Sequence, residues 1–317
     1  MRILLVKTSS LGDVIHNLPV VSDIRCHFPE AEIDWCVEDS FASIPRLHPA
    51  LHEVIPVAIR RWRKNLLKAP TWQEIGAFRR QIAARRYDAI VDTQGLLKSA
   101  LLARQAHGPH LGYAADSIRE PMAARLYDRC FHVSRELHAV VRNRRLAAAA
   151  LGYVAEGEAD YGVATTPGAF AWLPHRPYVV FLTASSRDDK LWPEANWLAL
   201  GQRLNSLGFS AILPGGSAVE RERAGRLAAG IPGALAAPPM SIPELASLLA
   251  GAKAAVGVDT GLTHLAVALN IPTVALYVAT DPGLTGVLGS GFHCNLGGKA
   301  QTPGVDGVLA ELQAVLA

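Results

Sequence analysis

Short apolar runs alternate with segments of helical period along almost the whole chain. The apolar runs show no polar alternation, which is typical of parallel strands buried on both faces. Such strands are expected at 3–6, 33–37, 53–57, 87–92, 178–182, 210–213, 254–258 and 273–277. Helices are expected between them at 13–27, 41–47, 72–85, 101–105, 119–151, 193–207, 219–229, 245–252, 263–269 and 308–316. This order predicts an α/β protein with doubly wound parallel sheets.

The periodic pattern is interrupted once, between residues 156 and 177. Glycine, proline, alanine and threonine dominate there, and no strong period is present. We therefore predict an N-terminal domain over 1–160, a linker over 161–177 and a C-terminal domain over 178–317. We leave open that the last helix packs back on the N-terminal domain.

Composition narrows the class of protein. Half of the 317 residues are hydrophobic, but no apolar run reaches the roughly 18 residues of a membrane span. Met1 leads directly into a strand, so we expect no signal peptide. The four cysteines form no CxxC pattern, which favours reduced thiols in a cytoplasmic protein over a zinc site or a redox pair.

Positive charge is concentrated in the first half of the chain. The net charge is only +3, but Arg60, Arg61, Arg63 and Lys64 form a dense cluster around Trp62. This asymmetry indicates an anionic partner for the first half, with a solvated charged loop as the alternative. We expect no nucleic acid, because the second half has no matching charge and no aromatic platform for stacking bases.

The first strand ends in a polar turn that carries one carboxylate, Asp13. Ligands of doubly wound sheets collect at the carboxyl ends of the strands, where this turn lies. Asp13 is therefore a candidate general base, and a helix cap is the alternative interpretation. A second polar turn, with Gln94, follows the strand at 87–92.

Three polar turns follow strands in the second half. Asp259, Thr260 and Gly261 lead into a helix, whose N-terminus favours a phosphate, although an ordinary N-cap fits equally well. Lys190 lies in the charged loop after strand 178–182, where a cation could reach a phosphate, although a solvated charged loop is the commoner case for such a run. Glu220 follows a Gly-Gly turn, which is either a simple turn or a place that leaves room for a nucleoside with Glu220 on its ribose hydroxyls.

Several well-known motifs are absent from the sequence. There is no Walker pattern, no GxGxxG after the first strand, no HExxH and no serine elbow. Asp188 and Asp189 are adjacent and do not form the DxD pair that holds a metal-bound sugar nucleotide. We therefore expect neither an essential metal nor a cofactor.

Three motifs together resemble the lipopolysaccharide heptosyltransferases of glycosyltransferase family 9. They are Lys7-Thr-Ser-Ser-Leu-Gly-Asp-Val-Ile-His-Asn-Leu-Pro19, Asp259-Thr-Gly-Leu-Thr-His264 and Thr280-Asp-Pro-Gly283. The resemblance implies a GT-B fold, in which two Rossmann-like domains face one another, with the acceptor on the first and the nucleotide sugar on the second. It also implies transfer of L-glycero-D-manno-heptose from ADP-heptose to the inner Kdo of Kdo-lipid A. Such an enzyme works as a peripheral protein on the cytoplasmic face of the inner membrane, and we expect a monomer.

The resemblance also assigns site residues by position. The ADP-heptose site would comprise Ser185, Ser186, Lys190, Glu220, Met240, Asp259, Thr260, Gly261 and His264. Within it, Lys190 would lie near the diphosphate, Glu220 on the ribose and Met240 against the adenine. Independently of the resemblance, we predict an acceptor site of Ser10, Arg60, Arg61, Arg63, Lys64, Gln94 and Arg119, in which the basic cluster would hold the acceptor's phosphates and Kdo carboxylates.

The expected reaction is an inverting displacement. Asp13 would take the proton of the acceptor hydroxyl while that hydroxyl attacks the anomeric carbon opposite ADP. Lys190 and the helix terminus at Thr260 would stabilise the departing diphosphate. Three alternatives stay open: a heptosyltransferase that needs an already heptosylated acceptor, a nucleotide-sugar epimerase of the same fold, and a non-catalytic nucleotide- or lipid-binding protein.

Overall fold

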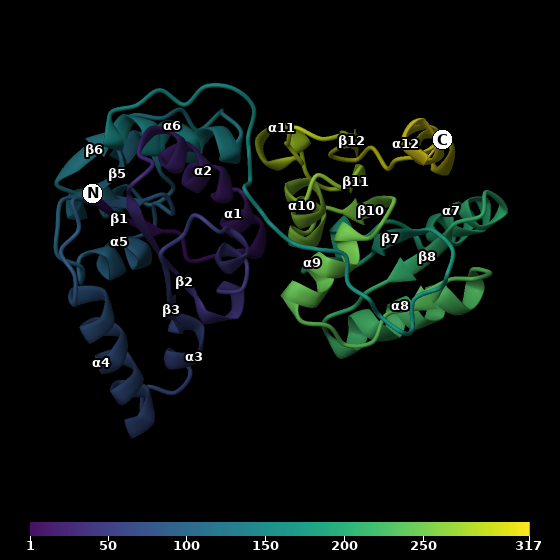
Figure 1. Cartoon of the computed structure of the whole chain (residues 1–317), viewed down its shortest axis with the longest axis horizontal. Coiled ribbons are helices and arrows are strands. Elements are labelled where there is room, and N and C mark those ends of the chain that lie inside the picture. The colour runs from purple at the N-terminus through teal and green to yellow at the C-terminus, as the bar shows by residue number, and fades with distance from the viewer. Residues whose placement is uncertain (317) are drawn as a thin grey trace. The chain divides into compact units, whose positions relative to one another are not determined.

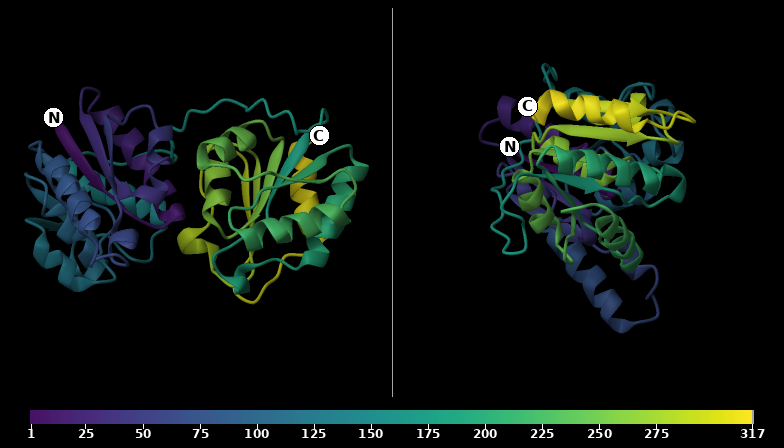
Figure 2. Two further views of the ribbon diagram at one scale, coloured as in Figure 1. Left: turned by 90° about the horizontal axis from the view of Figure 1, so that it is seen from below. Right: turned by 90° about the vertical axis from the view of Figure 1, so that its right-hand side faces the viewer.

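The chain folds into two compact units, Met1–Val163 and Ala164–Ala317 (Figure 1). The structure is a computed structural model that describes residues 1–316. The boundary between the units falls inside the segment predicted as a linker, 161–177. Each unit contains one six-stranded sheet whose strands all run parallel. The strands of the second sheet run between layers of helices (Figure 2).

The first unit has the strand order β3-β2-β1-β4-β5-β6. Its strands are β1 (Arg2–Val6), β2 (Glu32–Glu38), β3 (Glu53–Val57), β4 (Ala89–Asp92), β5 (His110–Tyr113) and β6 (Arg129–Phe131). Its α-helices are α1 (Leu11–Ile15), α2 (Leu18–His27), α3 (Ile59–Trp62), α4 (Ala69–Ala83), α5 (Leu97–Ala103) and α6 (Ala139–Leu151). Four 3₁₀ turns complete it: η1 (Asp39–Phe41), η2 (Pro45–Leu47), η3 (Ala115–Ser117) and η4 (Pro121–Leu126).

The second unit repeats this topology with the order β12-β11-β10-β7-β8-β9. Its strands are β7 (Tyr178–Leu182), β8 (Ser210–Leu213), β9 (Leu235–Ala236), β10 (Ala254–Val258), β11 (Thr273–Tyr277) and β12 (His293–Gly297). Its helices are η5 (Asp188–Lys190), α7 (Glu194–Ser206), α8 (Ala218–Gly230), α9 (Ile242–Ala250), α10 (Gly261–Ala268), α11 (Pro282–Thr285) and α12 (Val305–Leu316). Both sheets are therefore doubly wound, as predicted, and the fold is of the GT-B type.

Two helix predictions in the first unit are wrong in detail. The helix expected over 13–27 is broken after Ile15, and a new helix starts at Leu18 with Pro19 in its first turn. Proline suits that position because it has no N–H to leave unsatisfied and its φ is already helical. Within 119–151 only Ala139–Leu151 is α-helical, because the preceding residues form η4 and β6.

The structure contains four strands that the sequence did not reveal: β5, β6, β9 and β12. Strands β6, β9 and β12 are edge strands, β5 lies next to an edge of the first sheet, and β9 has only two residues. In β6 and β9 the side chains are mostly exposed, so no apolar run marks them. The two sheets thus extend further from their centres than the pattern of apolar runs indicates.

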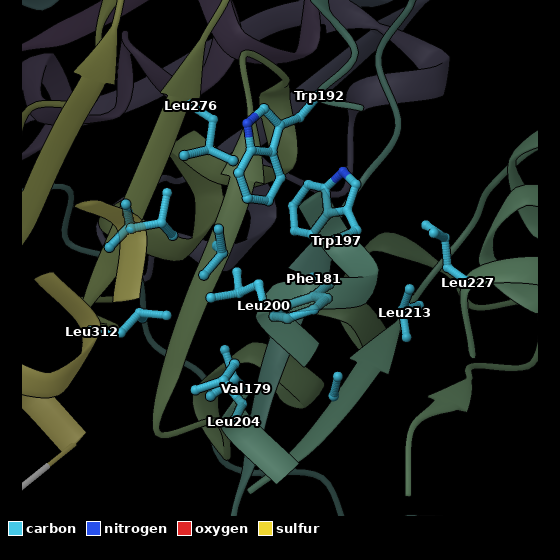
Figure 3. Packing of buried hydrophobic residues seen from close by; sticks show 14 of the residues in the cluster. Val179, Phe181, Trp192, Trp197, Leu200, Leu204, Leu213, Leu227, Leu276 and Leu312 are labelled. Atoms are coloured by element: carbon cyan, nitrogen blue, oxygen red, sulfur yellow. The ribbon is translucent and has the colours of Figure 1, made fainter. Parts of the chain in front are cut away.

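A cluster of aromatic side chains forms part of the core of the second unit (Figure 3). Trp197 packs edge-on against Trp192, with 5.0 Å between ring centroids, and tilted against Phe181 at 4.9 Å. The indole of Trp192 also donates a hydrogen bond to the carbonyl of Pro303, at 2.9 Å. Trp192 closes the loop that carries Lys190, so this core anchors the loop at its C-terminal end.

The last helix, α12, packs on α7, β10 and β11 within the second unit. Val308, Leu309 and Leu312 are its buried residues, and they join the same core as Trp192. The C-terminal helix is thus part of the second unit's own hydrophobic core.

Among residues 1–316, no helix combines the length and the apolar composition that crossing a bilayer requires.

Candidate active site

The chain leaves β1 and β4 toward opposite sides of the first sheet, and the loops after these neighbouring strands meet at their carboxyl ends. The side-chain oxygen of Gln94 accepts hydrogen bonds from the backbone N–H groups of Thr8 and Ser9, both at 3.0 Å. Lys98, from the start of α5, donates to the hydroxyl of Ser9 at 3.1 Å. The structure therefore brings Gln94 next to the turn that carries Ser10.

Asp13 lies in the first turn of α1 and is partly exposed. Its Oδ2 accepts hydrogen bonds from the backbone N–H of Ser10 at 2.6 Å and from the Ser10 hydroxyl at 2.9 Å. The carboxylate thus caps its own helix, which is the interpretation that the sequence offered beside a general base. A capping carboxylate that stays partly exposed can also accept a proton, so the two roles are compatible.

A buried lysine lies directly behind this turn. Lys7 follows β1, and its ammonium donates to the carbonyl of Thr93 at 2.9 Å and to Oδ1 of Asn143 at 3.5 Å. Burial lowers the pKa of Lys7, while the nearby carboxylates of Asp13 and Asp92 favour its charged form. Lys7, Lys98 and Asn143 are not among the site residues predicted from the sequence, although Lys7 opens the first motif.

The buried carboxylate of Asp92 holds the turn after β4 in place through hydrogen bonds. Its carboxylate accepts from the N–H of Gln94 at 2.9 Å, from the Ser99 hydroxyl at 2.8 Å and from the Tyr127 hydroxyl at 2.8 Å. Burial raises the pKa of Asp92, and these hydrogen bonds oppose that shift. Asp92 therefore serves to hold Gln94 in place and is not itself accessible.

The predicted acceptor cluster is not uniform. Arg61 is already paired, with Glu74 at 2.6 Å and with Asp39 at 3.2 Å. Arg60 lies over the ring of Phe41, 5.1 Å from its centroid. The remaining cations, Arg63, Lys64 and Arg119, are exposed and form no ion pair with any residue of the described range 1–316.

In the second unit, three strand ends converge on Asp259. The ammonium of Lys190 and the hydroxyl of Thr280 both donate to Oδ2 of Asp259, each at 2.7 Å. The hydroxyl of Ser185 donates to the backbone carbonyl of Asp259 at 3.2 Å. The cluster joins the loops after β7, β10 and β11, and Thr280 is a member that sequence analysis noted in a motif but did not assign to the site.

The helix that follows Asp259 has an uncapped N-terminus. Thr260 is the N-cap of α10 and Gly261 its first residue, and the Thr260 side chain makes no capping hydrogen bond within residues 1–316. The Asp259 carboxylate is held instead by Lys190 and Thr280. By contrast, α8 and α9 are each capped by a serine and a glutamate. The positive end of α10, with Lys190 beside it, suits an anion such as a phosphate.

Close packing fixes the first turn of α10 against β10. The Thr263 hydroxyl donates to the carbonyl of Val258 at 2.7 Å, and a Cβ on Gly257 would lie only 2.1 Å from that hydroxyl. A glycine is therefore required at position 257 for the first turn of α10 to pack this closely against β10. His264, the next residue of the helix, is buried in this packing.

The other predicted donor residues lie along the same edge of the sheet. Ser186 is exposed beside Ser185, and Met240 is half-buried just before α9. Oε2 of Glu220 accepts from the N–H groups of Gly216 at 2.8 Å and Ser217 at 2.9 Å, so this carboxylate caps α8. The ribose and adenine contacts of Glu220 and Met240 remain predictions.

One group of potential metal ligands lies away from these turns. Asp34, His52 and Glu53 present ligand atoms close to one another, near the amino ends of β2 and β3. The guanidinium of Arg85 contacts both carboxylates, at 3.1 Å from Asp34. Because a cation already neutralises these acids, the group is explained as a structural ion-pair network.

Comparisons with known proteins identify relatives over nearly the whole chain. The family model of glycosyltransferase family 9 (heptosyltransferase) matches residues 75–307. Lipopolysaccharide heptosyltransferase 1 of Pseudomonas aeruginosa is 50% identical over 303 residues, which cover 93% of this chain and 85% of the relative. The enzyme of the same name from Salmonella typhimurium is 48% identical over 291 residues, covering 91% of this chain and 92% of the relative.

Solved structures agree with these sequence relatives. The Escherichia coli heptosyltransferase WaaC with ADP superposes with a TM-score of 0.90 at 43% identity, covering 99% of both chains. The same E. coli protein with ADP-2-deoxy-2-fluoro heptose gives a TM-score of 0.86 at 42% identity, again covering 99% of both chains.

Proposed function

Because the chain belongs to glycosyltransferase family 9, the heptosyltransferases, we propose that it transfers a heptose from ADP-heptose to the core of lipopolysaccharide. The extent of the similarity supports this, since relatives named lipopolysaccharide heptosyltransferase 1 share about half of their residues with it. The enzyme is therefore a glycosyltransferase, and its donor is a nucleotide sugar.

The cluster around Asp259 is the observation that carries the donor assignment. Lys190 supplies a positive charge, and the uncapped end of α10 supplies free backbone N–H groups next to it. A diphosphate that departs from the heptose gains negative charge, and fixed donors of this kind stabilise it where that charge develops. Homologues solved with ADP and with an ADP-heptose analogue support a nucleotide-sugar donor.

For the acceptor we propose the inner Kdo of Kdo-lipid A, on the cytoplasmic face of the inner membrane. The unpaired cations Arg63, Lys64 and Arg119 of the first unit match the carboxylates and phosphates of such a molecule. Heptosyltransferase 2 of E. coli is only 26% identical, compared with 50% for heptosyltransferase 1 of P. aeruginosa. This difference favours addition of the first heptose over addition of the second.

In the proposed reaction, Asp13 is the base that takes the proton of the attacking Kdo hydroxyl. The hydroxyl oxygen forms the new bond to the anomeric carbon as the bond to ADP breaks on the opposite face, so the configuration inverts. Ser10 holds Oδ2 of Asp13, which fixes the carboxylate at the end of β1. The proposal includes no metal, no cofactor and no second subunit.

The proposal is tested by incubating the protein with ADP-heptose and Kdo-lipid A and measuring the mass of the acceptor. We expect a gain of one heptose. A matched reaction with an already heptosylated acceptor should give no product. A further reaction with ADP-heptose alone should leave the sugar unchanged, whereas an epimerase would convert it. If mass is gained only by the heptosylated acceptor, the acceptor assignment is wrong.

A further inference from the structure

The turn between α3 and α4, together with the first turn of α4, projects from the rest of the first unit. We call residues 63–72 the α3–α4 tip. In Figures 1 and 2, α4 extends away from the sheet of this unit, and the tip lies at its far end. Because α3 follows the carboxyl end of β3, the tip belongs to the same edge of the sheet as Ser10 and Gln94.

The α3–α4 tip exposes three large apolar side chains. Leu67 is fully exposed, at 103% of its reference area, and Trp72 and Leu66 are 59% and 48% exposed. The indole N–H of Trp72 already donates to the carbonyl of Leu66 at 2.8 Å. The indole can therefore enter an apolar medium without leaving a donor unsatisfied, which is otherwise a large penalty.

Unpaired cations surround these apolar side chains. Arg63, Lys64 and Lys68 are exposed and form no ion pair within the described residues, unlike Arg61 just before them. Leucine and tryptophan flanked by lysine and arginine are the composition of segments that lie in the interface of an anionic membrane. The cations complement lipid phosphates, and the apolar side chains complement the acyl boundary.

We propose that the α3–α4 tip docks on an anionic phospholipid bilayer, with Leu66, Leu67 and Trp72 inserted at the level of the headgroups. Lys68 contacts the phosphates of the surrounding lipids, while Arg63 and Lys64 hold the anionic groups of the lipid-linked acceptor in the same headgroup layer. The idea rests on the proposed function in one respect, since a lipid-linked acceptor lies in a bilayer. Docking by the tip brings the acceptor edge of the first unit to the membrane surface.

The test measures cosedimentation with vesicles of phosphatidylethanolamine and phosphatidylglycerol, and with vesicles of phosphatidylcholine alone. We expect the wild type to bind the anionic vesicles more tightly than the neutral ones. The double variant Leu66→Ser/Leu67→Ser should bind the anionic vesicles at least about tenfold more weakly, because it loses apolar area that inserts into the bilayer. Leu101→Ser is the matched control: Leu101 is 53% exposed on α5 of the same unit, and its loss should leave binding unchanged.

A second measurement reports insertion directly. Brominated phosphatidylglycerol quenches the fluorescence of a tryptophan that reaches the acyl boundary. It should therefore quench the fluorescence of the wild type, and most of this quenching should be lost in Trp72→Phe. Heptose transfer to a deacylated, water-soluble Kdo acceptor should be equal in the wild type and in Leu66→Ser/Leu67→Ser. This arm separates docking from recognition of the acceptor sugar.

Three results would overturn the docking proposal. They are failure of the wild type to bind anionic vesicles, equal binding by the wild type and the double variant, and a loss of transfer to the soluble acceptor in that variant. The second result would leave a protein partner as the occupant of the tip. If the wild type transfers no heptose to any acceptor but its vesicle binding depends on Leu66 and Leu67, the proposed function fails and the docking proposal holds.

Discussion

The central turns of the two sheets have the same topology but opposite chemistry. In the first unit, the turn after β1 carries Asp13, and Gln94 after β4 bridges back to it through a neutral amide. In the second unit, the equivalent turn after β7 carries Lys190, which bridges to Asp259 after β10 through an ion pair. The fold therefore provides two similar crevices, and the side chains decide which of them takes an anion.

Helix capping sharpens this difference. The first helix after β1 is capped by its own carboxylate, which places negative charge where a phosphate would otherwise bind. Within residues 1–316 the helix after β10 has no such cap, because Lys190 and Thr280 hold the Asp259 carboxylate. The turn after β1 is thus suited to a neutral hydroxyl, and the turn after β10 is suited to a diphosphate.

The largest effect is expected from Asp13→Ala. If Asp13 is the base, turnover should fall by about 10²–10⁴-fold, while ADP still binds to the second unit. Steady-state kinetics and ADP titration measure the two quantities separately.

Glu244→Ala is the matched control for Asp13→Ala. Glu244 caps α9 by accepting from the N–H and hydroxyl of Ser241, both at 2.7 Å, much as Asp13 accepts from Ser10. Both variants should lose some unfolding free energy, because each removes a carboxylate that caps a helix. If both variants turn over at near-normal rates, Asp13 is only a cap and the comparison between the two turns loses its catalytic meaning.

Lys190→Met should give the next largest effect. It removes the charge that would face the diphosphate and leaves the Asp259 carboxylate, only 11% exposed, without its cation. Charge-assisted hydrogen bonds contribute about 1.5–3 kcal/mol, so ADP affinity should fall by about 10–100-fold. Calorimetric titration with ADP gives the value, and Lys190→Arg should restore part of it.

Lys253→Met controls for the loss of a lysine from the same unit. Lys253 is exposed just before β10, at the amino end of the strand. The Lys253→Met variant should bind ADP with the same affinity as the wild type. Equal affinity in Lys190→Met and the wild type would mean that the ion pair with Asp259 only ties two loops together.

The sequence predicted the central strands of each sheet and the polar turns at their carboxyl ends. Strands β1, β2, β7 and β10 are apolar runs buried on both faces, and such runs are visible in sequence. Strands β6 and β9 were missed because they are short and exposed, so pairing with a neighbour defines them and their composition does not. Local composition thus reveals central strands better than edge strands.

Contacts between distant residues could not be predicted. Lys190 and Asp259 were both assigned to the donor site, but their ion pair joins residues 69 positions apart. Likewise, the sequence shows Arg61 and Arg63 as equivalent cations, and only the fold shows that Arg61 is paired with Glu74. The types of residue in a site follow from the sequence, whereas their availability follows from tertiary contacts.

Gln94→Met tests the neutral bridge of the first unit. It removes the acceptor of two N–H groups, on the buried residues Thr8 and Ser9. Unsatisfied buried donors are costly, and we expect the unfolding free energy to fall by about 1–3 kcal/mol in urea titrations. Gln202→Met, at an exposed position of α7, should change it by less than about 0.5 kcal/mol. If the two variants are equally stable, the bridge does not hold the turn.

The smallest effect is expected within the basic cluster, where the charges differ in availability. Arg63→Gln and Lys64→Gln should each raise the KM for Kdo-lipid A by about 3–10-fold, since each removes one exposed and unpaired contact to an anionic acceptor. Arg61→Gln should raise it less, because Glu74 and Asp39 already occupy that guanidinium. The KM for ADP-heptose should stay constant in all three variants, because these residues belong to the first unit. An equal rise in acceptor KM for all three would show that Arg61 leaves its partners to bind the acceptor, and no rise in any would show that the acceptor's charges are recognised elsewhere.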